Sequence, residues 1–296
     1  MDRPLSRRAV LAGGAGMVLL SACGSSGPKS ATTSTAPAGH GNVLVALFDG
    51  AGSLVSGRPQ RITFAIANQT GALLEKSPPS IQLTVARDGG SAIGPRTVAR
   101  HNAGLPRSYY PFTFTPQAAG SYQVTAEVDG QQLTAAFTVG ADEDVKIPGV
   151  GAPMPVVDTP TTSDHRGVDP ICTRSPACPL HSVDLRQALA AKRPTALIIA
   201  TPAYCQTAIC GPVLDVVLHE YKAFPQITFI HSEVYDSAKD AEANGANAKL
   251  APVLQALGMT FEPCLFLIGA DGRVAQRIDV IVDEVELRQR LTEFSR

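Results

Sequence analysis

The sequence contains no tryptophan, and aromatic residues make up only 5% of it. An aromatic cage or a base-stacking platform is therefore not expected. Charge is also sparse, because charged residues account for 17% of the chain, the formal net charge is -1, and no long run of Lys and Arg occurs. This balance argues against nucleic acid as a partner, since proteins that bind polyanions carry a basic patch or stripe.

Cysteine is missing from a long part of the chain. One of the six cysteines is Cys23, and the other five lie between Cys172 and Cys264. A folded region between these two positions therefore contains no internal disulfide. The chain has 296 residues, of which 44% are hydrophobic, which is enough apolar material for about two domains.

The N-terminal residues 1–23 have the pattern of an export signal. A charged start is followed by about a dozen apolar residues, which is typical of a secretory signal and too short for a stable membrane span. The pair Arg7-Arg8 resembles the twin-arginine export signal of bacteria. The sequence Leu-Ser-Ala-Cys at 20–23 resembles a bacterial lipobox, which implies that Cys23 is lipidated and becomes the first residue of the mature protein.

Residues 24–41 are rich in Gly, Ser, Thr and Pro and predict a flexible linker, because they offer little apolar surface to bury. A linker after a lipidated cysteine would hold the folded part at the extracytoplasmic face of the cell membrane. Disulfides persist in that compartment. No other segment reaches the roughly 18 uncharged apolar residues that a membrane span needs.

Residues 42–140 show short runs that alternate between apolar and polar residues. The period of two predicts β-strands, and the pair Asp129-Gly130 between two runs predicts a hairpin turn. We expect a β-sandwich of roughly seven strands. The predicted runs include residues 43–45, 62–66, 81–85, 112–114, 122–128 and 133–139.

The segment 116–124 resembles the corner of immunoglobulin-like domains, in which a tyrosine hydroxyl, here that of Tyr122, bonds back to the chain. The Cys–Trp–Cys core of antibody domains is missing, so the resemblance implies only the architecture. Four polar and aromatic residues flank a turn and are expected at the surface, with a binding edge as the alternative: His101, Arg107, Tyr109 and Tyr110.

Residues 141–180 are rich in proline and predict an irregular connector, and residues 181–296 predict an α/β domain. The expected order is α-β-α-β-α-β-β-α, ending in a β-hairpin and a helix. The expected helices cover residues 183–191, a segment that contains 213–221, and residues 250–257 and 284–294, and Ser182 is expected to cap the first of them. The expected strands are 195–200, 227–230, 265–268 and 274–282.

Cys205 and Cys210 fall between a buried strand and the helix that follows it. A helix N-terminus favours a thiolate, which is the attacking species in disulfide exchange, and a second nearby cysteine can resolve a mixed disulfide. This arrangement resembles a thioredoxin-like domain over roughly residues 180–296. The resemblance matches Cys210-Gly-Pro to the family's Cys-Gly-Pro and implies that Pro263 is its cis-proline.

The spacing departs from that family, because four residues rather than two separate Cys205 from Cys210. Either Cys210 is the thiol at the helix start and Cys205 lies in the preceding loop, or Cys205 is the exposed attacker with Cys210 buried below it. We favour Cys205 as the more accessible sulfur. The family's buried carboxylate is missing from the preceding strand, and Glu233 or Glu262 could replace it, although a surface or strand-end charge is the expected role of each.

The other thiols predict structural roles. Cys172 and Cys178 are expected to form a disulfide that closes a loop, and the rival is a copper or zinc site with His181. Cys264 is the odd cysteine and is expected to point into the core near the active helix. His231 ends an apolar strand and is expected to be a buried, hydrogen-bonded histidine without a ligand role.

Together these patterns predict a lipid-anchored thiol–disulfide oxidoreductase that uses Cys205 and Cys210, needs no cofactor and acts on protein thiols and disulfides of the cell envelope. The alternative is a non-enzymatic lipoprotein, either a scaffold with a structural disulfide or a copper-handling protein similar to the Sco-type chaperones. Those chaperones place a cysteine pair and a distant histidine on a thioredoxin-like fold, but their pair has a three-residue gap. A third alternative, a peroxidase, fits the motif less well because Pro202 is one residue too far upstream.

Overall fold

The computed structural model describes residues 41–50, 52–205 and 208–296. The expected signal segment 1–23, with Cys23, and the linker up to residue 40 lie outside the described residues. Within the described ranges, none of the helices has the length and apolar character that crossing a membrane requires.

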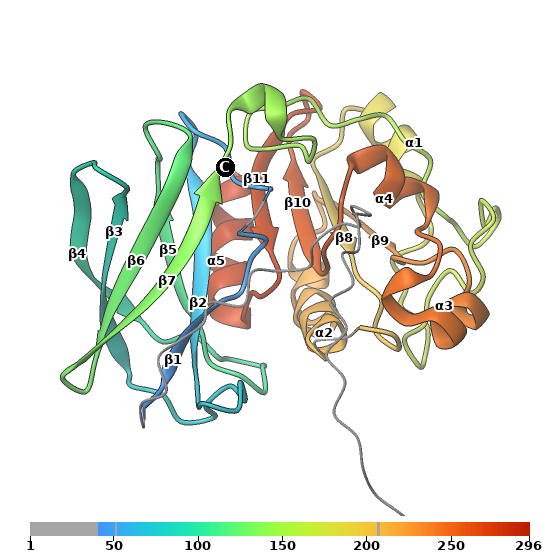
Figure 1. The fold of residues 1–296 in the computed structure, drawn as a ribbon. Helices are drawn as coiled ribbons and strands as arrows, with labels where there is room; N and C mark the ends of the chain where they lie inside the picture. Colours follow the sequence, from blue (N-terminus) through green and yellow to red (C-terminus); the bar gives the residue numbers. More distant parts are fainter. Residues whose placement is uncertain (1–40, 51, 206–207) are drawn as a thin grey trace, which may run out of the picture. The chain divides into compact units, whose positions relative to one another are not determined.

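The N-terminal part of the described chain is an all-β sandwich with the immunoglobulin-like architecture expected from its sequence (Figure 1). One sheet has the strand order β1-β2-β5 and the other β4-β3-β6-β7, and all pairings are antiparallel. The strands are β1 (Val43–Ala46), β2 (Gln60–Ala67), β3 (Ser80–Arg87), β4 (Ala92–Ala99), β5 (Tyr110–Phe114), β6 (Gly120–Val128) and β7 (Gln131–Val139).

Alternation of side chains builds this sandwich. In β7 every second residue from Leu133 to Val139 is buried, as a period of two requires. The hairpin between β6 and β7 turns at Asp129 and Gly130, which both have positive φ, at 49° and 77°. The Tyr122 hydroxyl donates a 2.8 Å hydrogen bond to the Ala118 carbonyl, so the expected tyrosine corner is present.

Strand β4 was not expected from the sequence, because most of its residues are exposed and no apolar alternation marks it. It pairs along one side only, with β3, and edge strands tolerate proline, here Pro95. Gly94 has φ of 115°, and a Cβ there would lie 2.6 Å from the Leu83 carbonyl oxygen. The strand therefore depends on glycine for its close approach to β3.

The C-terminal part is an α/β unit with a four-stranded sheet in the order β11-β10-β8-β9. Strands β8 and β9 are parallel, and β10 is antiparallel to β8 and β11. The elements are α1 (Leu185–Ala190), β8 (Thr195–Ile199), α2 (Cys210–Glu220), β9 (Thr228–Ser232), α3 (Ala238–Asn244), α4 (Pro252–Leu257), β10 (Cys264–Ile268), β11 (Val274–Asp279) and α5 (Glu284–Phe294), with short 3-10 helices η1 (Asp142–Asp144), η2 (Tyr221–Ala223) and η3 (Gly245–Asn247).

The two faces of this sheet carry different helices. Helices α2 and α5 pack on the face that receives Ile198 and Leu265. Helices α1, α3 and α4 pack on the opposite face, which receives Ile199 and Phe266. Strands β8 and β10 are fully buried because both faces are covered, which explains their continuous apolar sequences.

Two details of this unit differ from the expectation. Helix α1 begins at Leu185, and the side chain of Asp184 rather than Ser182 caps it, by accepting a hydrogen bond from the Gln187 backbone N–H. Helix α3 was not predicted, because only Ala241 of its seven residues is buried and no apolar stripe marks it.

Tyr109 and Tyr110 are both 0% exposed, so the expectation that they lie at the surface is wrong. The Tyr109 hydroxyl donates a 2.7 Å hydrogen bond to Glu286 in α5 and lies beside the Arg61–Glu286 ion pair, which is also 2.7 Å long and buried. His101 Nδ1 contacts Asp283 at 3.1 Å, so this edge is occupied by residues of the same chain. Of the four turn-flanking residues, Arg107 is the one that reaches an exposed partner, Glu75.

Candidate functional site

Cys205 and Cys210 form a disulfide at the junction of β8 and α2, with their Cα atoms 5.9 Å apart. Cys210 is the first residue of α2 and is 0% exposed. Cys205 lies in the preceding loop and is partly exposed. The two arrangements considered from the sequence are therefore compatible. Cys210 is the sulfur at the helix start and is buried, and Cys205 lies in the preceding loop and is the more accessible sulfur.

The start of helix α2 faces the more exposed sulfur. The Cys210 backbone N–H donates to Cys205 Sγ at 3.3 Å. This N–H belongs to the first helical turn, whose N–H groups have no partner within the helix and carry a positive partial charge. A thiolate on Cys205 would therefore be stabilised relative to the thiol.

Glu262 contacts the buried sulfur from the other side. Its Oε2 lies 3.1 Å from Cys210 Sγ and accepts a 2.7 Å hydrogen bond from the Thr201 backbone N–H. Burial raises the pKa of Glu262 to about 8, the Thr201 N–H opposes this, and the charge of Glu233 adds to it. Glu262 is partly exposed and lies just before β10, so the strand-end alternative holds, and its carboxyl also contacts the buried sulfur of the pair.

Glu233 directly follows β9, so it is a strand-end residue, but it is only 1% exposed and the surface alternative is wrong for it. The Thr201 hydroxyl donates to its Oε2 at 2.6 Å, and the Thr173 backbone N–H donates to its Oε1 at 2.6 Å. Burial raises the pKa of Glu233, although His231 and these hydrogen bonds oppose the shift. Glu233 and Glu262 thus share Thr201 as a hydrogen-bonding partner.

Pro263 lies directly before β10, and the Glu262–Pro263 peptide bond is cis, as the resemblance to the thioredoxin-like family led us to expect. The Pro263 carbonyl accepts a 2.7 Å hydrogen bond from the Val280 N–H. This contact holds the segment that carries Glu262 against the neighbouring strand.

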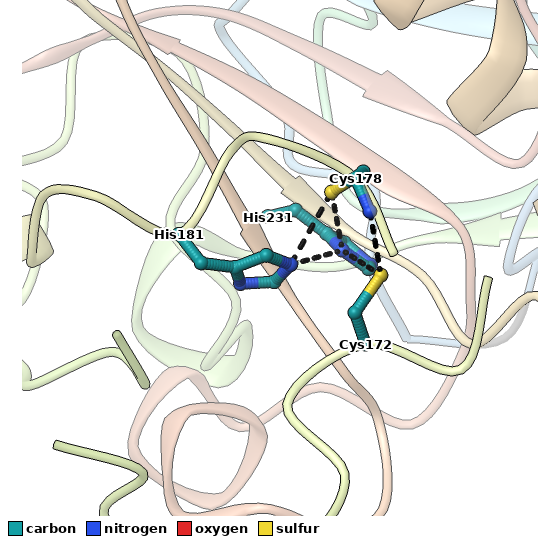
Figure 2. Close-up of side chains that lie close together, drawn as sticks. All are labelled: Cys172, Cys178, His181 and His231. Carbon is teal, nitrogen blue, oxygen red and sulfur yellow. Dashed lines mark hydrogen bonds between the residues drawn. The ribbon is translucent and has the colours of Figure 1, made fainter. Parts of the chain in front are cut away.

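Four buried side chains, Cys172, Cys178, His181 and His231, form a second cluster (Figure 2). Their potential ligand atoms all lie within 4.8 Å of one another. Cys172 and Cys178 are free cysteines, so the expected loop-closing disulfide is absent. The imidazoles of His181 and His231 instead lie close to both sulfurs. The cluster therefore contains the three residues of the rival metal site and, in addition, His231.

His231 is 0% exposed and hydrogen-bonded, as expected, but it also has a specific orientation. Its Nε2 lies 2.9 Å from the Ala200 carbonyl oxygen, which only an N–H at Nε2 can satisfy. In the neutral imidazole, Nδ1 then carries a lone pair and faces both sulfurs, at 3.4 Å from Cys178 and 3.8 Å from Cys172.

His181 directs its Nε2 into the same space, 3.2 Å from Cys178 Sγ and 3.3 Å from His231 Nδ1. Its other ring nitrogen, Nδ1, is buried and has no hydrogen-bond partner among the described residues. The ring is therefore oriented by packing and by the cluster that Nε2 faces.

The two thiols of the cluster differ in acidity. A hydrogen bond from Cys178 lowers the pKa of Cys172 strongly, helped by the two imidazoles. The same hydrogen bond, together with burial, raises the pKa of Cys178 strongly. Burial lowers the pKa of His231, but Cys172 and Glu233 outweigh it, and the net shift is upward. The cluster therefore favours one negative sulfur.

Cys264 is buried, but its side chain points into the core on the face of the sheet that does not carry α2, so this expectation is wrong. Strand β10 alternates its side chains, and Leu265 faces α2 while Cys264 faces the opposite core with Phe266. Burial raises the pKa of Cys264 well above its usual value, with a contribution from Asp279.

The sequence pattern missed His231 as a member of the cluster, and a polar residue inside the apolar strand β9 was its only signal. The backbone explains the contact, because the His231 N–H donates to the Leu180 carbonyl at 2.9 Å and holds the 172–181 segment beside the strand. A role for Glu262 beside the cysteine pair, in contrast, was already considered from the sequence, together with the same role for Glu233.

No protein-family model matches the chain. No curated protein matches it either. Among solved structures it is similar to the Lin-41 filamin domain, with 18% identity, a TM-score of 0.24 and coverage of 33% of this chain and 91% of that one. The titin M3 domain is 18% identical with a TM-score of 0.21, and the match covers 34% of this chain and 95% of that one. The superoxide reductase neelaredoxin from Ignicoccus hospitalis is 10% identical with a TM-score of 0.24, and the match covers 34% of this chain and 80% of that one. Similarities with TM-scores of this size carry no further conclusion about this chain.

Proposed function

We propose that the protein is a thiol–disulfide oxidoreductase with a thioredoxin-like C-terminal domain, anchored by a lipid on Cys23 at the extracytoplasmic face of the cell membrane. Its redox centre is the Cys205–Cys210 pair, and its substrates are thiols and disulfides of envelope proteins. The observation that carries the proposal is the 3.1 Å contact between Cys210 Sγ and the partly buried Glu262 carboxyl, whose pKa is raised to about 8.

The order of elements supports the family. The elements follow the order of the resemblance described above: a strand, the cysteine-bearing helix α2, a parallel strand and further helices. A strand that begins directly after Pro263, a hairpin and a last helix complete the order. The departure remains the longer loop between the cysteines. In this loop Cys205 reaches the partly exposed side of the helix start, and Cys210 stays beneath it.

The reaction has two exchange steps. The Cys205 thiolate attacks a substrate disulfide, forms a mixed disulfide and releases one substrate sulfur as a thiolate, which takes a proton from water. Cys210 then transfers its proton to the Glu262 carboxylate and attacks Cys205 Sγ, so that the Cys205–Cys210 disulfide forms and the second substrate sulfur leaves. The substrate disulfide gains two electrons and the cysteine pair loses two, and the reverse sequence oxidises a substrate dithiol.

A carboxyl with a pKa near the working pH is suited to the proton transfer, because it accepts and returns a proton readily. In the disulfide form the Cys205 and Cys210 sulfurs are bonded to each other, so Glu262 can hold the proton until the next reduction. Among the described residues, the histidines that lie beside thiols contact Cys172 and Cys178, whereas the Cys205–Cys210 pair is grouped with a carboxyl. This favours disulfide exchange at that pair over the Sco-like copper-handling alternative.

The test is reduction of insulin disulfides by dithiothreitol in the presence of the protein. We expect Cys205→Ser and Cys210→Ser to abolish the acceleration and Cys264→Ser, the buried thiol on the opposite face, to retain it. A wild-type pair that stays oxidised at roughly -300 mV and exchanges with no dithiol would instead be a structural disulfide. Stoichiometric Cu(I) binding that either Cys205→Ser or Cys210→Ser abolishes would favour the copper-handling alternative.

A further inference from the structure

The strongest feature that disulfide exchange does not use is the buried cluster of Cys172, Cys178, His181 and His231. Two thiols and two imidazoles are the ligand set of tetrahedral zinc sites. Three of these residues come from one segment before α1, and His231 comes from β9, so the cluster joins two parts of the chain. Figure 2 shows the four side chains directed toward one common point.

Four of the distances between ligand atoms are close to those of a tetrahedron around such an ion. With metal–sulfur bonds of about 2.3 Å and metal–nitrogen bonds of about 2.0–2.1 Å, sulfur and nitrogen should be about 3.5 Å apart and the nitrogens about 3.3 Å apart. The sulfur–nitrogen separations are 3.2 Å for Cys178–His181, 3.4 Å for Cys178–His231 and 3.8 Å for Cys172–His231. The nitrogen–nitrogen separation of His181 and His231 is 3.3 Å.

The surroundings orient the ligands. The Ala200 carbonyl accepts from His231 Nε2 and so keeps Nδ1 available for a metal ion, which is the usual arrangement of a metal-binding imidazole. The Cys178 backbone N–H donates to Cys172 Sγ at 3.3 Å, a contact that favours a thiolate at this sulfur.

Charge selects the kind of ion. Two thiolates and two neutral imidazoles carry two negative charges, which a divalent cation cancels, whereas a monovalent ion such as Cu(I) would leave a buried net charge. All four residues are at most 7% exposed, so no coordination position opens to solvent. Closed sites of this kind are structural, since catalytic zinc sites keep one position for water or substrate.

We propose that Cys172, Cys178, His181 and His231 bind one divalent cation of the zinc class in a closed tetrahedral site. Binding forms two metal–sulfur bonds, and each proton that a cluster thiol still carries leaves to solvent. The ion fastens the 172–181 segment to β9. Thr173 lies in this segment, and its side-chain hydroxyl accepts a 3.2 Å hydrogen bond from the Ala203 N–H in the loop that leads to Cys205.

The first test is metal content, measured by elemental analysis on the full chain purified under reducing conditions without chelator. We expect one zinc per chain in the wild type and at least a tenfold loss in Cys178→Ser and in His231→Gln. Two controls should keep one zinc: His219→Gln, which removes an exposed imidazole, and the double variant Cys205→Ser/Cys210→Ser, which removes the redox pair. Loss of zinc in the double variant would place the ion at the redox pair and overturn the proposal.

A second test uses the wild type alone, so a variant that fails to fold does not decide the outcome. The reduced protein is alkylated with and without a zinc chelator, and each cysteine is read by mass spectrometry. We expect Cys172 and Cys178 to be protected until the chelator is added, and Cys264 to stay unreactive in both samples because it is buried. Equal reactivity of the two thiols in both samples, or a Cys172–Cys178 disulfide in the folded protein, would overturn the site.

Cobalt(II) serves as the spectroscopic probe of geometry. Added to chelator-treated, reduced protein, it should produce the intense visible absorption of tetrahedral Co(II) and a thiolate-to-cobalt charge-transfer band, and both should disappear when zinc is added. A protein that takes up Cu(I) but neither Co(II) nor zinc would contradict the proposal. The double variant separates this site from the proposed function, because it should lose disulfide exchange and keep the cobalt spectrum.

Discussion

The Thr201 hydroxyl donates a 2.6 Å hydrogen bond to Glu233 Oε2, and the Thr201 backbone N–H donates to Glu262 Oε2 at 2.7 Å. Thr201 lies two residues after the end of β8 and hydrogen-bonds groups of both sites of the molecule. Glu262 contacts the redox pair, and Glu233 Oε1 lies 4.0 Å from Nε2 of His231 in the Cys/His cluster. One residue thus hydrogen-bonds both the buried Glu233 carboxyl and the partly exposed Glu262 carboxyl.

Replacing Thr201 by Val should destabilise the protein, because it removes the hydroxyl donor from a buried carboxyl while the shape stays similar. We expect a loss of about 1–3 kcal/mol in the free energy of unfolding, the cost of leaving a buried polar group without its partner. The measurement is chemical denaturation of the oxidised protein. Thr228→Val is the control, since Thr228 accepts from Arg193 at an exposed site, and an equal loss there would contradict the explanation.

Glu262 should make the stability depend on pH in a defined direction. Its pKa is raised from 4.5 to about 8 in the folded protein, so in this window the folded state binds more protons than the unfolded state. The contribution of Glu262 is fully present below about pH 4.5 and is lost as the pH rises through about 8. Denaturation of the oxidised protein at several pH values should show this decline, and Glu262→Gln should flatten it.

The control for this pH effect is Glu242→Gln in α3, which replaces an exposed carboxyl. It should leave the wild-type pH dependence unchanged. A wild-type profile that Glu262→Gln does not alter would show that the carboxyl titrates in the ordinary range.

The two cysteines of the pair should differ in reactivity once the disulfide is reduced. Cys205 is partly exposed and faces the helix N-terminus, whereas Cys210 is buried, so alkylation of Cys205 should be at least about tenfold faster. Peptide mass spectrometry after timed quenching measures both rates. A Cys210→Ser variant should also trap a mixed disulfide on Cys205, and trapping through Cys210 in Cys205→Ser would reverse the assigned roles.

The Arg61–Glu286 ion pair should be important for stability, because both side chains are almost fully buried, at 3% and 6% exposure. Arg61 also donates to the Ile281 carbonyl at 2.7 Å, so removing it leaves several acceptors unpaired. We expect Arg61→Met to cost about 3–5 kcal/mol, as for other buried pairs that lose one partner. Thermal or chemical denaturation measures the effect.

The matched control is Arg107→Met, which breaks an exposed pair with Glu75. Surface ion pairs contribute about 0–1 kcal/mol, so this variant should unfold almost as the wild type does. If both substitutions had the same small effect, Arg61 would not have the buried partner described here.

The proposed lipid anchor should depend on Cys23. In a bacterial host that processes lipoproteins, the wild type should appear in the membrane fraction and incorporate labelled palmitate, and Cys23→Ser should lose both properties. Arg7→Lys combined with Arg8→Lys should block export if the twin-arginine route is used. Cys264→Ser is the control, and unchanged membrane association of Cys23→Ser would contradict the anchor.

Much of the local structure could be predicted from the sequence. Alternating runs such as residues 133–139 specify strands because one face of a sheet is buried and the other is solvated, and the Asp129-Gly130 pair specifies its turn through positive φ. The position of Cys205 and Cys210 between a buried strand and a helix was also evident, because apolar periodicity changes there. Each of these features depends on neighbours within about ten residues in the chain.

The surroundings of each sulfur depended on the tertiary structure. Cys172 and Cys178 lie close enough in sequence to suggest a disulfide, but His231, more than fifty residues away, enters the space between them because β9 pairs with β8. Glu262 reaches Cys210 because β10 pairs with the same strand, and that pairing places Cys264 on the opposite face. The sequence alone determined which residues could do the chemistry, and strand register decided which of them meet, because one residue of register exchanges the two faces of a sheet.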